Sequence, residues 1–194
     1  MKKNTIIIVI AALALILLWG VSRYNKLVSA EEAVSSQWGN VENQYQRRAD
    51  LIPNLVATVK GYAAHESQTL EAVTAARAKA TQVTVDPTSL TPEKLQEFQA
   101  AQGELSSALG RLLMITENYP DLKANQNFIE LQAQLEGTEN RIAVERNRFN
   151  EMARNYNATI RRFPTSLIAA IFGFEKKPYF EAQDGTEKAP EVKF

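Results

Sequence analysis

Apolar residues recur at helical spacing along most of the chain, and turn-forming residues divide the pattern into segments. The first segment covers residues 24–49. Three apolar residues at intervals of seven mark its buried face: Leu27, Val34 and Val41. Asp50 and Pro53 then indicate a break, because Asp can cap a helix and Pro is tolerated in a first turn. A second helix is therefore predicted over residues 52–81.

Two further helices are predicted after a loop at residues 84–91. Thr91-Pro92-Glu93 is a helix start with Pro at the first helical position, and that helix extends to about Asn118. Tyr119-Pro120-Asp121 turns the chain again. The fourth helix has six apolar or aromatic residues at strict intervals of seven: Phe128, Leu135, Ile142, Phe149, Tyr156 and Phe163. The second row of heptad positions on the same helix is half polar. This pattern favours one wall of an antiparallel bundle over a dimeric coiled coil.

The N-terminal pattern predicts a transmembrane anchor over residues 1–23. No charge occurs from Thr5 to Ser22, and these residues would span roughly 26 Å as a helix. Trp19 lies where an interfacial aromatic belt is expected. A cleaved signal peptide is the alternative, since Val28-Ser29-Ala30 is a passable cleavage site. The long apolar run, and a helical pattern that begins upstream of that site, favour the anchor.

The expected fold is all-α: a transmembrane helix followed by an elongated antiparallel bundle of about four long helices over residues 24–174. Residues 175–194 are predicted to form a poorly ordered tail, apart from Tyr179 and Phe180. The basic N-terminus, Lys2 and Lys3, favours a cytoplasmic N-terminus and a bundle on the exported side of a bacterial inner membrane. With four antiparallel helices, the end of the fourth should return to the bilayer.

The segment at that returning end is the predicted contact surface. Phe163 to Phe174 is too short to span a bilayer and unusually apolar. Its expected contacts are the bilayer, a neighbouring copy, another membrane protein or the bundle's own end. Basic residues precede it, and they either form a solvated, salt-bridged face or contact anionic lipid or an acidic partner. The predicted contact residues are Arg154, Arg161, Arg162, Leu167, Ile168, Ile171, Phe172 and Phe174.

Composition argues against several functional classes. The chain has 22 basic and 22 acidic residues, so no overall field favours nucleic acid. It has no cysteine, which excludes disulfides and thiol chemistry. Its one histidine, His65, precedes Glu66 as in a zinc-protease helix, but the second histidine of that motif is absent. We therefore expect no catalytic residues, no metal and no cofactor.

The stretch at residues 47–56, which begins with charged residues, allows two interpretations. Arg47 or Arg48 could pair with Asp50 and hold a buried interhelical turn. Alternatively, the same stretch could form a docking surface.

At these residues the chain resembles the LemA family. The resemblance rests on motifs in order along nearly the whole chain: residues 24–28, 47–56, 59–62, 65–66, 75–77, 119–124, 127–128, 139–143, 156–157, 163–164, 173–174 and 178–180. It implies a membrane helix with an elongated bundle, an association with membrane stress or membrane organisation, and no catalytic residues.

The leading hypothesis for function is a non-enzymatic, membrane-anchored scaffold that forms homo-oligomers. An adaptor or regulator of a membrane protease, or of another membrane partner, is the alternative. A membrane hydrolase is disfavoured by the single histidine, the absent cysteine and the missing motifs.

Overall fold

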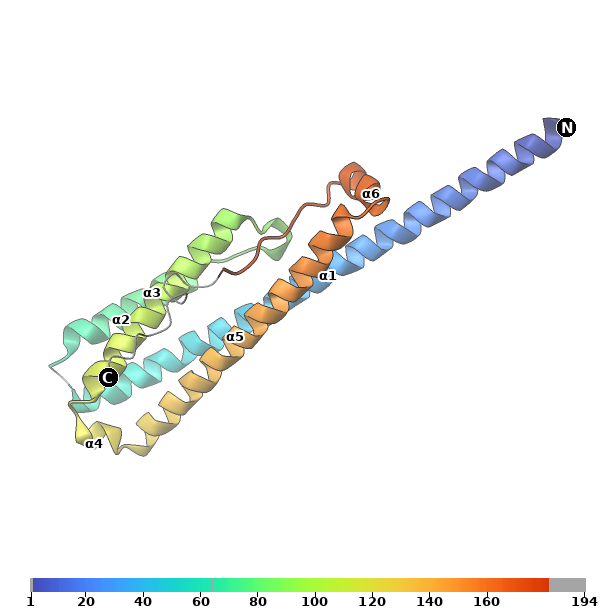
Figure 1. Ribbon diagram of the computed structural model, residues 1–194. Helices are drawn as coiled ribbons and strands as arrows, with labels where there is room; N and C mark the ends of the chain where they lie inside the picture. The colour runs from blue at the N-terminus through green and yellow to red at the C-terminus, as the bar shows by residue number, and fades with distance from the viewer. Residues whose placement is uncertain (1, 64, 182–194) are drawn as a thin grey trace, which may run out of the picture.

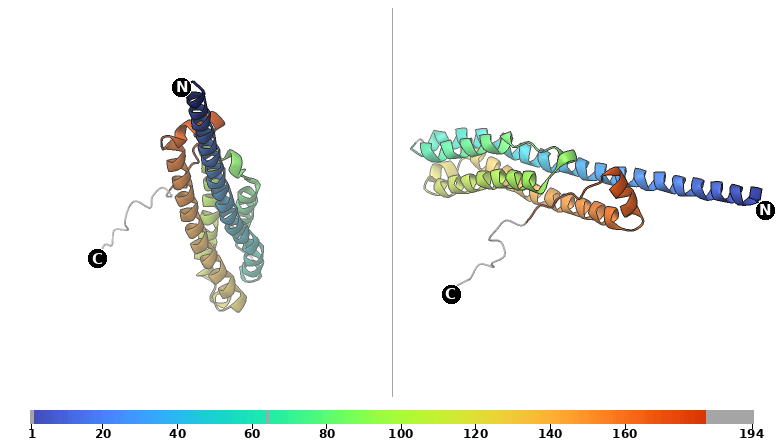
Figure 2. Two further views of the ribbon diagram at one scale, coloured as in Figure 1. Left: turned by 90° about the vertical axis from the view of Figure 1, so that its right-hand side faces the viewer. Right: turned by 90° about the horizontal axis from the view of Figure 1, so that it is seen from above.

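The fold is a helical bundle with one helix that projects far beyond it (Figure 1, Figure 2). The computed structural model describes residues 2–63 and 65–181, and every regular element in those ranges is helical. The elements are α1 (Lys2–Tyr62), α2 (Ser67–Gln82), the 3-10 turn η1 (Pro87–Ser89), α3 (Pro92–Thr116), α4 (Pro120–Lys123), α5 (Gln126–Arg161) and α6 (Thr165–Phe172). The second half of α1 packs with α2, α3 and α5, which confirms the predicted all-α class.

The N-terminal part of α1 is the one helix, among the described residues, that is long and apolar enough to cross a membrane. Its most apolar 18-residue window has a mean hydropathy of 2.7, and none of that window is buried within the chain. This candidate spanning segment and the first bundle helix form a single uninterrupted helix, so the orientation of the bundle is coupled directly to that of the segment.

The predicted break at Asp50 and Pro53 is wrong. The helix continues through Pro53 and ends at Tyr62, and α2 begins at Ser67. Proline interrupts most helices because it lacks an N–H and its ring crowds the carbonyl four residues earlier. That carbonyl belongs to Ala49, and it finds a partner on α2. Among the described residues the bundle still has four long helices, α1, α2, α3 and α5, which alternate in direction as predicted.

The later boundaries agree with the sequence signals. Thr91 caps α3 by accepting a hydrogen bond from the backbone N–H of Lys94 at 3.3 Å. Asn125 caps α5 in the same way through the N–H of Phe128, at 3.0 Å. In the loop before α3, the Asp86 carboxylate accepts from both the N–H and the hydroxyl of Thr88, and these bonds lower the pKa of Asp86.

A buried polar layer divides the core into two apolar halves. Arg48 on α1 donates to the Glu139 carboxylate on α5 at 2.7 Å and to the Ser106 hydroxyl on α3 at 2.9 Å. It also donates to the side-chain oxygen of Gln102 at 2.6 Å, and Gln102 in turn donates to the carbonyl of Ala80 on α2. Four helices thus meet at one guanidinium. Apolar clusters lie on either side of it.

The contacts of Arg48 show that the predicted buried turn at residues 47–50 is wrong. No turn is present there, and Asp50 is an exposed residue that accepts a hydrogen bond from Gln46 at 2.8 Å. Arg48 pairs with Glu139 instead, and it is buried rather than available for docking.

The heptad row of α5 forms the predicted core seam except at its last member. Five of its six residues are buried: Phe128, Leu135, Ile142, Phe149 and Tyr156. Phe163 is 81% exposed, because α5 ends at Arg161 and the row no longer follows a helix beyond that point.

Residues 174–181 form an extended C-terminal strap that packs along α5. Asn157 brackets Lys177, donating to its carbonyl at 2.8 Å and accepting from its N–H at 2.9 Å. Asn150 brackets Phe180 in the same manner, and the Phe180 ring stacks on Trp38 with centroids 5.7 Å apart. The predicted tail from residue 175 therefore starts too early. The rest of that tail, residues 182–194, lies outside the described residues.

Candidate membrane-contact surface

Helix α6 lies beside α1 at the point where the apolar part of α1 enters the bundle (Figure 1). The Tyr24 ring contacts those of Phe172 and Phe174, with centroids 4.7 and 5.8 Å away. A Cβ placed on Gly20 would lie 3.8 Å from Cδ1 of Ile168. This position agrees with the prediction that four antiparallel helices return the chain to the anchor.

The inner face of α6 packs against the bundle. Thr165 and Ala169 are buried, and Ile168 and Phe174 pack against the core cluster that contains Leu27 and Ala169. Gly173, with φ of +74°, ends the helix in a left-handed conformation, and the following N–H of Phe174 bonds to the Ala169 carbonyl at 2.9 Å. This cap turns the chain off α6 and into the strap, which fixes α6 across the end of the bundle.

The outer face of α6 is apolar and uncovered. Leu167 is 57% exposed, Ile171 73% and Phe172 58%, and the neighbouring Phe163 adds a fourth large apolar side chain. Single exposed apolar residues are ordinary, but four large ones within one short segment indicate a candidate contact site. We call these four residues the α6 face.

The structure divides the predicted contact residues into three groups. Leu167, Ile171 and Phe172 lie on the α6 face, whereas Ile168 and Phe174 are half-buried against the bundle. The basic residues Arg161 and Arg162 end α5 next to this face. Arg154 is exposed on α5, two turns further from it.

Phe163, from the predicted contact segment, and Tyr24 on α1 also contribute to this surface. Phe163 is the most exposed member of the α6 face, yet the heptad count assigns it to the core. Tyr24 supplies the aromatic contact that holds α6 against α1. The Pro164 that follows Phe163 is the local signal that α5 could end before Phe163, since residues preceding a proline disfavour the helical conformation.

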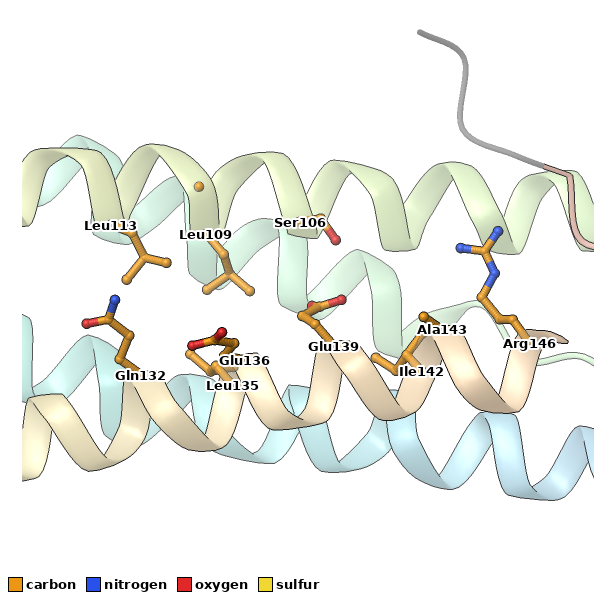
Figure 3. A pocket seen from close by; sticks show the side chains of 11 residues that line it. Ser106, Leu109, Leu113, Gln132, Leu135, Glu136, Glu139, Ile142, Ala143 and Arg146 are labelled. Carbon is orange, nitrogen blue, oxygen red and sulfur yellow. The ribbon is translucent and has the colours of Figure 1, made fainter. Parts of the chain in front are cut away.

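A second surface feature is a groove between α3 and α5 (Figure 3). It encloses about 730 Å³ and is open to solvent on one side. Leu109 and Leu113 from α3 face Leu135 and Ile142 from α5, and polar side chains line its edges. Glu139 in this groove is already bonded to Arg48, and Arg146 at one end donates to the carbonyl of Glu181 at 2.9 Å.

Polar side chains in and beside the groove form hydrogen bonds between or within helices. Ser106 in the groove accepts from Arg48 and donates to the Gln102 carbonyl. His65 is exposed in the turn between α1 and α2, at the end of the bundle away from α6. Beside it, the Glu66 carboxylate accepts from the Tyr119 hydroxyl at 3.0 Å, and this bond raises the pKa of Tyr119. Within residues 2–63 and 65–181, no three His, Cys, Asp or Glu side chains are grouped to hold a metal ion.

These features define a membrane-associated helical bundle with one candidate spanning helix. The sequence model of the LemA family matches residues 37–194, most of the chain, and the chain belongs to this family.

Named relatives agree with this assignment. Magnetosome protein MamQ of Magnetospirillum gryphiswaldense is 29% identical over 175 residues, which cover 81% of this chain and 64% of that protein. Magnetosome protein MamQ 2 of Paramagnetospirillum magneticum is 27% identical, over 91% of this chain and 70% of the relative. Protein LemA of Metamycoplasma hominis is 25% identical, over 84% of this chain and 71% of the relative. The chain thus spans about two thirds of the length of these relatives.

Proposed function

We propose that this protein is a non-enzymatic, membrane-anchored scaffold. In this proposal the apolar part of α1 crosses a bacterial inner membrane once, and the bundle lies on the exported side. The α6 face rests in the bilayer interface and holds the bundle in a fixed orientation to the membrane. Neighbouring copies then associate into homo-oligomers.

The observation that carries this proposal is the apolar α6 face, located where α1 leaves its apolar segment. An apolar patch of this kind is disfavoured in water, and the nearest apolar phase is the bilayer that the adjoining segment of α1 could span. Because α1 is one continuous helix, the face and the spanning segment keep a constant spacing. Attachment to the bilayer through both the α6 face and the spanning segment would restrict the tilt of the elongated bundle relative to the membrane.

The bundle itself supports a structural role. Its one fully buried arginine joins four helices, and its strap is held by asparagine side chains. Polar groups of this kind fix which helices meet and in which register. A rigid body with a defined register suits a scaffold that must present the same surface in every copy.

Counting copies in a membrane tests the scaffold. Val144 is exposed on α5, and a Val144→Cys variant of the cysteine-free chain accepts one dye per copy. In proteoliposomes at low protein density, most spots should bleach in more than one step. Single-step bleaching at every density would contradict self-assembly.

The groove between α3 and α5 favours a second candidate, an adaptor or regulator that binds a membrane protease or another membrane protein. Its apolar floor and charged edges resemble the surfaces that receive a partner segment. A chain that is monomeric in the bleaching experiment would leave the adaptor as the better account.

A further inference from the structure

Basic residues occur at the end of the bundle that holds the α6 face, and we call them the basic band. It combines three parts of the chain that are far apart in sequence: the exit of α1, the end of α5 and the start of the strap. Within residues 20–26 and 161–176 there are five basic residues and one acidic residue. The basic ones are Arg23, Lys26, Arg161, Arg162 and Lys176, and the acidic one is Glu175.

The members of this band form no ion pairs with any described residue, unlike the buried basic residues Arg48 and Lys177. Arg48 pairs with Glu139, and Lys177 pairs with Glu31 at 2.8 Å. In the band, Lys26, Arg161 and Arg162 are exposed, and only Arg23 is half-buried, with its guanidinium over the Trp19 ring. These charges are therefore available to an external anion.

The band also separates charge along the molecule. The whole chain is neutral, with 22 basic and 22 acidic residues, yet residues 27–160 contain 17 acidic and 12 basic residues. The end that holds the α6 face is positive and the body of the bundle is negative. Such a dipole orients a molecule at a negatively charged surface with its positive end inward.

We propose that the α6 face and its basic band together form a binding site for anionic phospholipid headgroups. The inference rests on the proposed placement of the α6 face in the bilayer interface. The apolar side chains enter the acyl region, and the band lies at the depth of the lipid phosphates. Lys26, Arg161 and Arg162 supply the charge, since lysine and arginine side chains beside an apolar segment extend to headgroups.

We favour a lipid over an acidic protein because these cations occur at the same end of the bundle as an apolar face, beside the candidate spanning helix. An acidic protein would have to cover exposed Ile171 and Phe172 as well as the charges. An anionic lipid satisfies both parts with one molecule, through its phosphate and its acyl chains.

Lipid quenching of a dye on α6 measures this selectivity with the full chain. An Ile171→Cys variant carries one environment-sensitive dye, and the protein is reconstituted in vesicles of phosphatidylcholine and phosphatidylglycerol. Two vesicle samples share one composition, but bromine quenchers are on the phosphatidylglycerol chains in one sample and on the phosphatidylcholine chains in the other. The ratio of quenching, corrected for mole fraction, gives the local enrichment of the anionic lipid.

We expect phosphatidylglycerol to be enriched on the order of threefold beside the dye. Replacing Lys26, Arg161 and Arg162 with glutamine should bring the ratio close to one, whereas Arg161→Lys with Arg162→Lys should preserve it. High salt should lower it, because salt screens exposed charges. As a matched control, glutamine at Lys60, Arg111 and Arg141 removes the same charge from other exposed positions and should leave the enrichment unchanged.

A ratio near one in the parent protein, with the dye quenched by both lipids, would overturn the lipid site while the α6 face stays in the bilayer. An enrichment that survives the triple glutamine substitution, with helical content unchanged, would overturn the role of the band. A dye that neither brominated lipid quenches would overturn the placement of the α6 face, and the lipid site with it. A further addition tests whether the band binds free phosphate instead of lipid headgroups. Inorganic phosphate, added at constant ionic strength, should leave the ratio unchanged.

Discussion

Arg77 on α2 donates its Nε–H to the backbone carbonyl of Ala49 on α1, with 2.7 Å between nitrogen and oxygen. Ala49 lies four residues before Pro53, so its carbonyl is the one that a proline at residue 53 leaves without a helical partner. A side chain from the neighbouring helix supplies the missing donor. The proline is thereby tolerated inside a helix of 61 residues.

This relationship predicts an interaction energy between Arg77 and Pro53. Arg77→Met should destabilise the protein by about 1–3 kcal/mol, because the Ala49 carbonyl is left unpaired. In a Pro53→Ala background the same substitution should cost less, since residue 53 then has an N–H for that carbonyl. Thermal unfolding of the four proteins of the cycle measures the difference. An equal cost of Arg77→Met in both backgrounds would show that the bond does not compensate for the proline.

The core seam predicts a large cost for Phe149→Ala. This ring is fully buried, and its centroid lies 5.6 Å from Trp38 and 5.4 Å from Phe180. Truncation should lower the free energy of unfolding by about 3–5 kcal/mol, through lost apolar burial and the cavity left behind. Val144→Ala, at an exposed position on the same helix, should change it by less than about 0.5 kcal/mol. Comparable losses in both variants would place Phe149 outside the core.

The strap predicts a specific role for Asn157. Asn157→Ala removes the partners of both the N–H and the carbonyl of buried Lys177, so we expect a loss of about 1–3 kcal/mol. Asn155→Ala, at an exposed site two residues away, is the control and should stay within about 0.5 kcal/mol of the parent. Amide hydrogen exchange at Lys177 should accelerate only in the first variant. Unchanged exchange would show that the strap is held by other contacts.

Two buried tyrosines predict how stability depends on pH. Burial raises the pKa of Tyr156 far above its ordinary value, with a further increase from Glu31 and Glu175 nearby, and burial also raises the pKa of Tyr45. The folded state therefore holds protons that the unfolded chain releases near pH 10. Their stabilising contribution is complete below about pH 10 and is lost as the pH rises above it.

Tyr156→Phe isolates one part of this effect. The Tyr156 hydroxyl is buried and has no hydrogen-bond partner among the described residues, so its removal should be nearly neutral at pH 7. Above pH 10 the variant should lose stability more slowly than the parent, as followed by thermal unfolding at several pH values. Parallel loss in the two proteins would contradict the titration of Tyr156.

The sequence predicts the helices well and some of their ends poorly, for physical reasons. Heptad spacing and caps such as Thr91 are local signals, and they identify α3, α5 and the returning direction of the chain. The continuity of α1 through Pro53 depends on Arg77, which lies 28 residues from its acceptor Ala49. The order of the strap depends in the same way on Asn150 and Asn157, which local patterns do not connect to it.

The candidate contact surface also combines residues that local sequence signals identify with residues that only the fold brings together. Local apolar density draws attention to Leu167, Ile171 and Phe172, which the structure shows to be exposed on α6. Phe163 is misassigned because the heptad count continues past the end of α5. The basic band joins α1 with α5 and the strap, and that grouping follows only from the fold.

The depth of Ile171 relative to the bilayer tests the account most directly. An Ile171→Cys variant of the full chain, spin-labelled in proteoliposomes, reports its collisions with oxygen, which concentrates in lipid, and with a water-soluble nickel complex. With the α6 face in the bilayer interface, as proposed, we predict frequent collisions with oxygen and few with nickel at residue 171. The matched label at residue 144, on an exposed part of α5, should show the opposite. Nickel collisions at residue 171 as frequent as those at residue 144 would contradict the account, and protection from both reagents would show instead that another protein surface covers the α6 face.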